Sequence, residues 1–267
     1  LFAVIVRNAQ GTLIMDNEFL VYATYIVIGI IAGFLNTVAG GGTLISMPVL
    51  IFMGLPGTVA NATIRVAILS QNIFAVAGFR SKGLKLPYPY VIWLALVSLA
   101  GGWLGAQIAS DLPDHVFKKI LAVIMVAVVL SIVFERKNTG LPEDERMGWK
   151  YQMISIAGFF LLSIYGGFIQ AGIGFLVIAL VSRVHRLSLV QTNYIKVFAA
   201  VLYTASAVVA FAIEGKIVWK VGFIIAIGHA IGAWFGSRWS VKAGDRWIKY
   251  VLLVADVILV AHLLLNP

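Results

Sequence analysis

Two basic residues lie in otherwise apolar stretches of the sequence, and each follows an asparagine. Asn61 and Arg65 are four residues apart, and Asn193 and Lys196 are three apart, so each pair shares one face of a predicted helix. A charged side chain inside a membrane costs at least about 2.5 kcal/mol, and such residues usually face a transport path or a partner. Two amides and two cations therefore predict a binding site for an anion. The alternative is that Arg65 and Lys196 reach the membrane interface or bond to backbone carbonyls.

A glycine-rich break precedes each pair, at 39–44 (AGGGTL) and at 171–176 (AGIGFL). Three consecutive glycines cost about 1 kcal/mol each relative to alanine in a helix interior, so one helix ends here and a short one begins. Thr43 is the predicted N-cap of the first short helix, and N–H groups at such a helix start can bind an anion. Close helix packing through small residues explains the glycines equally well, and Asn36, Thr37 and Gln170 could simply cap helix ends. The candidate substrate ligands at the breaks are Asn36, Thr37, Gly40, Gly41, Gly42, Thr43, Gln170, Gly172 and Gly174.

For other polar residues in apolar segments, the sequence gives weaker evidence of a functional role. His229 and Asp256 could form a proton relay, with a structural hydrogen bond as the favoured alternative. Gln71 and Asn72 are predicted to make interhelical hydrogen bonds. The sequence has no cysteine, no zinc-type His/Cys spacing and no nucleotide-loop or hydrolase motif, so we expect neither an enzyme nor a bound metal or cofactor.

The elements that must carry these residues are membrane helices. The 267 residues are 61% hydrophobic and 12% charged, against about 25% charged in soluble domains. The formal net charge of +9 comes from bases in short loops between apolar segments, where they contact membrane lipid, and we expect no nucleic-acid partner. Composition therefore predicts an all-α, multi-pass protein of the cell (inner) membrane.

Apolar segments divide the sequence into two halves. Residues 1–18 form an N-terminal extension, with Met15 as a candidate natural start; 19–134 form the first transmembrane repeat, 135–150 a cytoplasmic linker, and 151–267 the second repeat. The predicted spans are about 19–38, 59–79, 90–109, 116–134, 151–169, 189–213, 218–237 and 248–265, with short helices at about 43–53 and from the second break to residue 183.

The halves repeat each other in sequence. When the two glycine breaks are aligned, Asn61 falls on Asn193. With one residue of slippage, GGWLGA at 101–106 falls on GAWFGS at 232–237, and Asp114 on Asp245. This register predicts an internal duplication of five segments per half.

The distribution of bases predicts that the repeats are inverted. If both short helices cross the membrane, 13 bases lie on one side and 5 on the other. The positive-inside rule then makes the linker cytoplasmic and both termini extracytoplasmic. A short helix of about 16 Å can cross only where protein or water surrounds its ends, which implies a central cavity. The larger group is Arg80, Lys82, Lys85, Arg136, Lys137, Arg146, Lys150, Arg183, Arg186, Arg238, Lys242, Arg246 and Lys249, and the smaller is Arg7, Lys118, Lys119, Lys216 and Lys220.

The motifs GFLNTVAGGGTLISMPVL, LPGTVANAT, GGFIQAGIGFL and GAWFGSRW resemble the TauE/SafE-like sulfite-exporter family, also called toluene sulfonate uptake permeases. The resemblance covers about residues 20–265. It implies a transporter of sulfite, sulfonates, sulfoacetate or related anions, often an exporter. It also implies that Gly40 to Gly42, Asn61 and Gly172 to Gly174 lie in the repeat cores.

We therefore predict a secondary transporter of small sulfur-containing or organic anions that works by alternating access as an exporter. The alternatives are a flippase or intramembrane enzyme acting on a lipid-linked substrate, and a membrane sensor. An enzyme would need a catalytic dyad, which is not found, and a sensor is disfavoured by the duplication.

Overall fold

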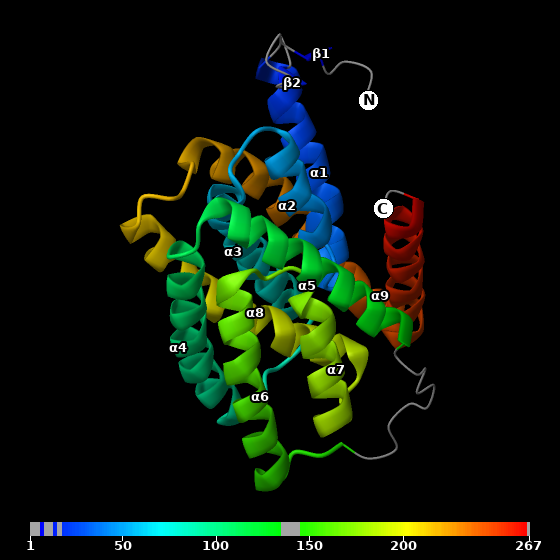
Figure 1. Ribbon diagram of the computed structural model, residues 1–267. Coiled ribbons are helices and arrows are strands. Elements are labelled where there is room, and N and C mark those ends of the chain that lie inside the picture. Colours follow the sequence, from blue (N-terminus) through cyan, green and yellow to red (C-terminus); the bar gives the residue numbers. More distant parts are fainter. Residues whose placement is uncertain (1–5, 8–12, 15–17, 135–144, 266–267) are drawn as a thin grey trace.

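A computed structural model of the protein describes residues 6–7, 13–14, 18–134 and 145–265, with side chains for most of 22–124 and 145–251. In this part of the chain the fold is a bundle of helices (Figure 1), which confirms the predicted all-α class. Five helices are long and apolar enough to cross a membrane. The elements are β1 Val6–Arg7, β2 Leu13–Ile14, α1 Glu18–Val38, α2 Thr43–Phe52, α3 Gly57–Ser81, α4 Tyr90–Ser110, α5 Asp114–Phe134, α6 Trp149–Phe168, α7 Ile173–His185, α8 Leu189–Ile213 and α9 Trp219–Leu265.

Each predicted segment corresponds to a helix or to part of one. The last two predicted spans both lie in α9, which turns sharply at Gly244 (φ 74°, ψ 178°). Pro56, Pro89 and Pro113 immediately precede α3, α4 and α5. Proline lacks an N–H and its fixed φ suits a helix start, which explains why these helices begin where they do. The paired strands β1 and β2 lie in the N-terminal extension and were not foreseen from the sequence.

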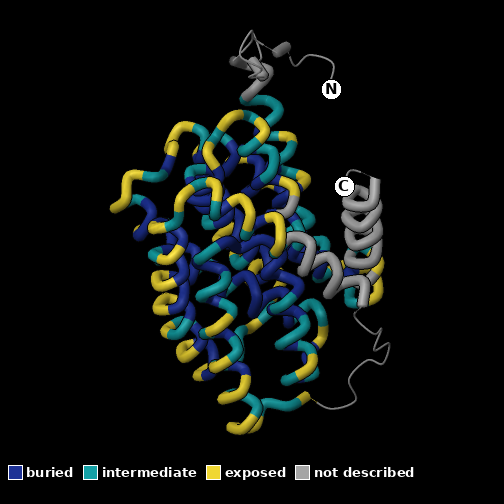
Figure 2. Tube along the Cα trace, viewed as in Figure 1, coloured by how far each residue is buried: buried dark blue, intermediate teal, exposed yellow. Residues whose placement is uncertain are grey.

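Helices of one half pack mainly on helices of the other half. α1 packs along α9 and α6 along α4, while α3 packs on α9 and on α8, and α8 on α4. Figure 2 shows the buried residues gathered through the middle of the bundle. The glycines of the GGWLGA and GAWFGS motifs permit these close contacts between helices. A Cβ added at Gly105 in α4 would lie only 1.9 Å from Ile164 O in α6, and one added at Gly232 in α9 would lie only 2.1 Å from Ile30 O in α1.

The aligned aspartates make equivalent contacts in the two halves. Asp114 Oδ1 accepts a hydrogen bond from Thr58 N at 3.2 Å, at the start of α3. Asp245 accepts from Leu189 N at 2.9 Å and from Val190 N at 3.1 Å, at the start of α8. A carboxylate is stabilised at a helix N-terminus, so each aspartate fixes the helix that carries its half's Asn and basic residue.

Candidate binding site at the broken helices

The two glycine breaks cross each other in the interior. A Cβ added at Gly174 would lie 2.3 Å from Gly40 Cα, and one added at Gly40 would lie 2.6 Å from Gly174 Cα. Gly40 (φ 93°) and Gly172 (φ 70°) have the left-handed conformation that favours glycine. The ends of α1 and α6 and the starts of α2 and α7 therefore meet with backbone against backbone.

Thr43 connects the two breaks. It is the first residue of α2, not the N-cap predicted from the sequence: Gly42 holds that position and no side chain caps the helix. The Thr43 hydroxyl donates instead to Gln170 O at 3.3 Å and accepts from Gly172 N at 3.4 Å. The helix start points at the other half, so the hydroxyl finds its partners there.

Asn61 and Arg65 hold the end of α6. Asn61 Nδ2 donates to Phe168 O, the last residue of α6, at 2.8 Å, and Arg65 Nη1 donates to Gly166 O. Arg65 Nη2 also donates to Asn61 Oδ1 at 3.2 Å, which confirms that the pair shares a helix face. The guanidinium lies 5.4 Å from the centroid of the Phe211 ring.

Asn193 and Lys196 hold the end of α1 in a corresponding way. Asn193 Nδ2 donates to Val38 O at 2.9 Å, and Lys196 Nζ donates to Asn36 O and Thr37 O at 3.0 Å each. Thus each half's Asn and basic residue bind the broken helix of the other half. A cation is favoured at the negative C-terminal end of a helix, which partly offsets the cost of burying it.

Both cations are buried, and neither has a carboxylate partner in the described part of the chain. Arg65 is 0% exposed and Lys196 is 4% exposed, so neither side chain reaches an interface. The ion pair found among the described residues is elsewhere, between Lys118 and Asp114 at 2.8 Å. Buried charges without a counter-ion are expensive, which makes them candidates for function.

A small cavity of about 10 Å³ adjoins the crossing, which is room for about one water molecule. Four of the predicted site residues line it: Asn36, Gln170, Gly174 and Lys196. The other lining residues are Asn72, Ile173, Ala200 and Tyr203.

The remaining predicted ligands do not line this cavity. Thr37 Oγ1 donates to Gly33 O in its own helix at 2.8 Å. A Cβ added at Gly41 would meet the Phe175 ring at 2.8 Å, and one at Gly42 would meet Ala32 O at 2.0 Å, so both glycines serve close packing. The others that lie outside it are Gly40, Thr43, Asn61, Arg65, Gly172 and Asn193.

The predicted proton relay is only half described. His229 is fully buried, and its Nδ1 donates to Gln71 Oε1 at 2.9 Å, an interhelical bond between α9 and α3. The predicted interhelical role of Gln71 is thereby confirmed, whereas Asn72 Nδ2 donates to Ile68 O in its own helix at 2.8 Å. The Asp256 side chain lies outside the described residues.

Tyr203 is a polar lining residue that the sequence analysis did not consider. It is 3% exposed, lies close enough to Arg65 for an electrostatic interaction, and packs against the space that a Cβ at Gly166 would occupy. A tyrosine in an apolar helix gives no sign of its neighbours. The alignment could have directed attention to it, because Tyr203 falls on Gln71 in the register that matches Asn193 with Asn61.

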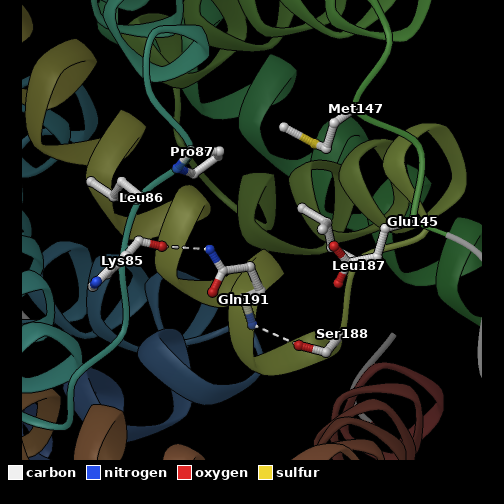
Figure 3. Close-up of a pocket in the computed structure, with 8 residues that line it drawn as sticks. All are labelled: Lys85, Leu86, Pro87, Glu145, Met147, Leu187, Ser188 and Gln191. Carbon is white, nitrogen blue, oxygen red and sulfur yellow. Dashed lines mark hydrogen bonds between the residues drawn. The ribbon is translucent and has the colours of Figure 1, made fainter.

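A larger pocket of about 410 Å³ opens between the loops at one end of the bundle (Figure 3). Gln191 Nε2 donates to Lys85 O at 2.8 Å across one wall, and Lys85 and Glu145 lie on opposite sides of the view. The lining residues are Lys85, Leu86, Pro87, Glu145, Met147, Leu187, Ser188 and Gln191. Gln191 precedes Lys196 by five residues on α8, which is about 7.5 Å along the helix axis.

A buried hydrogen-bond chain fixes the loops beside this pocket. His185 Nδ1 donates to Arg146 O at 2.8 Å, since a carbonyl can only accept, and Arg146 N donates back to His185 O at 2.8 Å. The Tyr90 hydroxyl therefore donates to His185 Nε2 at 3.1 Å, and it also contacts Ser155 Oγ. The end of α7 is thus attached to α4, to α6 and to the segment that enters α6.

The family model described as Sulfite exporter TauE/SafE matches residues 25–263. The chain belongs to the TauE/SafE family. This confirms the resemblance found in the sequence motifs and, with five candidate spans among the described residues, makes the chain a multi-pass membrane transporter.

Several TauE/SafE relatives match over nearly the whole chain. A probable membrane transporter protein of a Sinorhizobium species is 28% identical over 259 residues, covering 94% of this chain and 95% of its own. A probable membrane transporter protein of Haemophilus influenzae is 26% identical over 257 residues, covering 93% and 96%. The Arabidopsis thaliana protein named Sulfite exporter TauE/SafE family protein 3 is 28% identical over 174 residues, covering 61% and 34%. No solved structure matches the chain.

Proposed function

We propose that the chain is a secondary transporter that exports a small sulfur-containing or organic anion, of the sulfite, sulfonate or sulfoacetate class, across the inner membrane by alternating access. The observation that carries the proposal is the pair of buried cations at the crossing of the two broken helices. Both lack a carboxylate partner among the described residues, and one of them lines a cavity together with amides. An anion would supply the missing countercharge.

The proposed site comprises the Asn and basic residue of each half together with the backbone of the glycine breaks. The cations come from α3 and α8, and the helix ends come from α1 and α6. Movement of one half relative to the other would change these contacts, so the same groups can open toward either side of the membrane.

We propose inverted repeats as the basis of this movement, with α1–α5 as one repeat and α6–α9 as the other. Equivalent hydrogen bonds occur with the two halves exchanged. Asn61 of the first half donates to Phe168 O of the second, and Asn193 of the second half donates to Val38 O of the first. In Figure 1, α1 runs downward from the top of the view and α6 runs upward from the bottom, which suits an axis lying in the membrane plane.

Export also suits the energetics. An anion leaving a cell with a negative interior gains about 2.3 kcal/mol per charge for each 100 mV, so export requires no coupling ion. The pocket lined by Lys85, Glu145 and Gln191 lies at the end predicted to be cytoplasmic, and it is the proposed entrance for the anion.

The test is a thermal-stability screen of the purified protein with sulfite, thiosulfate, sulfate, taurine, isethionate, sulfoacetate and simple carboxylates, followed by efflux from proteoliposomes. At least one of these anions is expected to raise the apparent Tm in a saturable way. The same anion is expected to leave proteoliposomes faster than it leaves protein-free vesicles. If none does either, the proposed function is wrong.

Orientation can be tested separately, because the sequence contains no cysteine. Lys82, just after α3, and Lys119, in the second turn of α5, are exposed residues on opposite sides of the proposed arrangement. In intact cells, a membrane-impermeant maleimide is expected to label Lys119→Cys and to spare Lys82→Cys. The reverse pattern would contradict the predicted topology.

A further inference from the structure

We propose that the anion binds in the cavity beside Lys196, with Tyr203 and Asn72 as additional ligands, and that this cavity selects anions carrying a single charge. The inference rests on the proposed transport function and specifies the contacts and charge of its substrate.

The two cations have different surroundings. The guanidinium of Arg65 donates to Gly166 O and Asn61 Oδ1 and lies over the Phe211 ring, while its buried Nε has no partner among the described residues; Arg65 does not line the cavity. Lys196 lines the cavity and is held by two backbone carbonyls of α1. An ammonium can exchange carbonyl oxygens for anion oxygens without losing hydrogen bonds. Lys196 is therefore the cation that contacts substrate, and Arg65 positions the end of α6.

Gln170 shows that the cavity is built for a ligand. It is 2% exposed and has a left-handed backbone (φ 64°), a conformation that residues other than glycine rarely adopt. Its Nε2 bonds Thr204 Oγ1 at 3.1 Å, while its buried Oε1 accepts no hydrogen bond of normal geometry, although Tyr203 lies beside the amide.

Rotating the Gln170 amide by 180° resolves the unpaired oxygen. The Thr204 hydroxyl can then donate to Oε1, and the amide NH₂ turns toward the cavity. In this orientation the Gln170 amide can donate hydrogen bonds to an anion bound beside Lys196. The Tyr203 hydroxyl and the Asn72 amide, which also line the cavity, can donate to the same anion.

The charge of the lining sets the charge of the ligand. Lys196 is the one charged side chain among the lining residues, and no carboxylate joins it. A monoanion would neutralise the ammonium at the cavity wall, whereas the second charge of a dianion would have no further cation to contact among the lining residues. The cavity therefore favours a sulfonate or carboxylate with one charge over sulfate.

Binding also loosens the broken helix. The cavity of about 10 Å³ has room for about one water molecule, so an anion enters only if its walls separate. Those walls include Asn36 and Gln170 at the ends of broken helices. When Lys196 turns from Asn36 O and Thr37 O to the anion, the end of α1 loses two charge-assisted hydrogen bonds and becomes free to move.

The test measures affinities for methanesulfonate and sulfate at constant ionic strength, by thermal shift, in the parent and in Tyr203→Phe. Methanesulfonate is expected to bind at least about tenfold more tightly than sulfate, and Tyr203→Phe is expected to weaken methanesulfonate about tenfold, as expected for loss of a hydrogen bond to a charged group. Tyr90→Phe is the matched control. It removes a buried hydroxyl that does not line the cavity and should leave the affinity unchanged.

A second measurement follows the helix end directly. Ala39 is fully buried just after α1, and Ala39→Cys would be the only cysteine in the chain. Methanesulfonate is expected to accelerate labelling of Cys at position 39 by a small maleimide. If sulfate binds as tightly as methanesulfonate, the charge selection is wrong. If Tyr203→Phe binds methanesulfonate as tightly as the parent does, the proposed ligands are wrong. If methanesulfonate leaves the rate of labelling at position 39 unchanged, the loosening of α1 is wrong. If no anion in the earlier screen binds the parent, the proposed function itself fails, and this inference with it.

Discussion

Replacing Gly174 with alanine tests whether the crossing of the two breaks is as tight as the structure indicates. The new Cβ would lie 2.3 Å from Gly40 Cα and 2.8 Å from Gly40 O, where ordinary contact begins at 3.4 Å. Both neighbours are backbone atoms, so no flexible side chain can yield. Overpacking of this kind costs roughly 1–3 kcal/mol, and a contact more than 1 Å too short belongs at the upper end of that range.

Helix propensity acts in the opposite direction. Gly174 lies in α7 and has no positive φ, so alanine should gain about 1 kcal/mol of helix stability there. The expected net change is a loss of about 2 kcal/mol. For a chain of this size, 1 kcal/mol corresponds to a shift of about 2–4 °C, so the apparent Tm should fall by about 4–8 °C.

The assay is thermal unfolding in detergent, followed by the intrinsic fluorescence of the seven tryptophans. Gly158→Ala in α6 is the control, because its Cβ would meet only the end of the Leu180 side chain, which can move. Gly158→Ala should keep or slightly raise the Tm. If Gly174→Ala does the same, the close crossing is refuted and the reasoning from it fails.

Three further variants test single contacts by the same assay. Asp245→Ala removes the acceptor for two N–H groups at the start of α8 and should lower the free energy of unfolding by about 1 kcal/mol. Replacing the exposed Asp111 with alanine is the control and should change it by no more than about 0.5 kcal/mol. Equal losses of stability would contradict the capping role of Asp245. Tyr90→Phe keeps the ring but leaves His185 Nε2 without its donor, at a cost of about 1–3 kcal/mol, and an unchanged Tm would mean that the hydrogen-bond chain contributes nothing. Asn193→Ala leaves the last carbonyl of α1 unpaired in the interior and should also cost about 1–3 kcal/mol, so a neutral effect would show that another group satisfies that carbonyl.

Local chemistry explains why the helix boundaries could be predicted closely. Glycine and proline interrupt the apolar runs at the points where helices end, so the span predicted at 59–79 is α3 at Gly57–Ser81, and that predicted at 90–109 is α4 at Tyr90–Ser110. The sharing of a face by Asn61 and Arg65 also follows from helix geometry alone. These features depend on neighbours in the sequence, which a single chain shows directly.

Partners across the fold could not be predicted in the same way. Thr43 was assigned to its own helix because a threonine at a helix start usually caps it, and nothing in the sequence indicated that Gln170 and Gly172 lie closer. The cavity lining depends likewise on how α3, α8 and the two breaks pack, so Tyr203 and Asn72 became candidates only once that packing was known.

One residue of spacing explains why two similar basic groups have different roles. At 100° per residue, Arg65 lies 40° beyond Asn61 around α3, whereas Lys196 lies 60° short of Asn193 around α8, so equivalent helices direct their cations about 100° apart. The position equivalent to Arg65 in the second half is Val197, which packs in one apolar cluster with Phe79. Arg65 itself lies over Phe211, the residue equivalent to Phe79. Arg65 thus occupies a packing position that the other half fills with valine, while Lys196 occupies one that faces the cavity. In the proposed site, the shift of one residue along the helix leaves Arg65 holding the end of α6 and places Lys196 at the wall of the cavity.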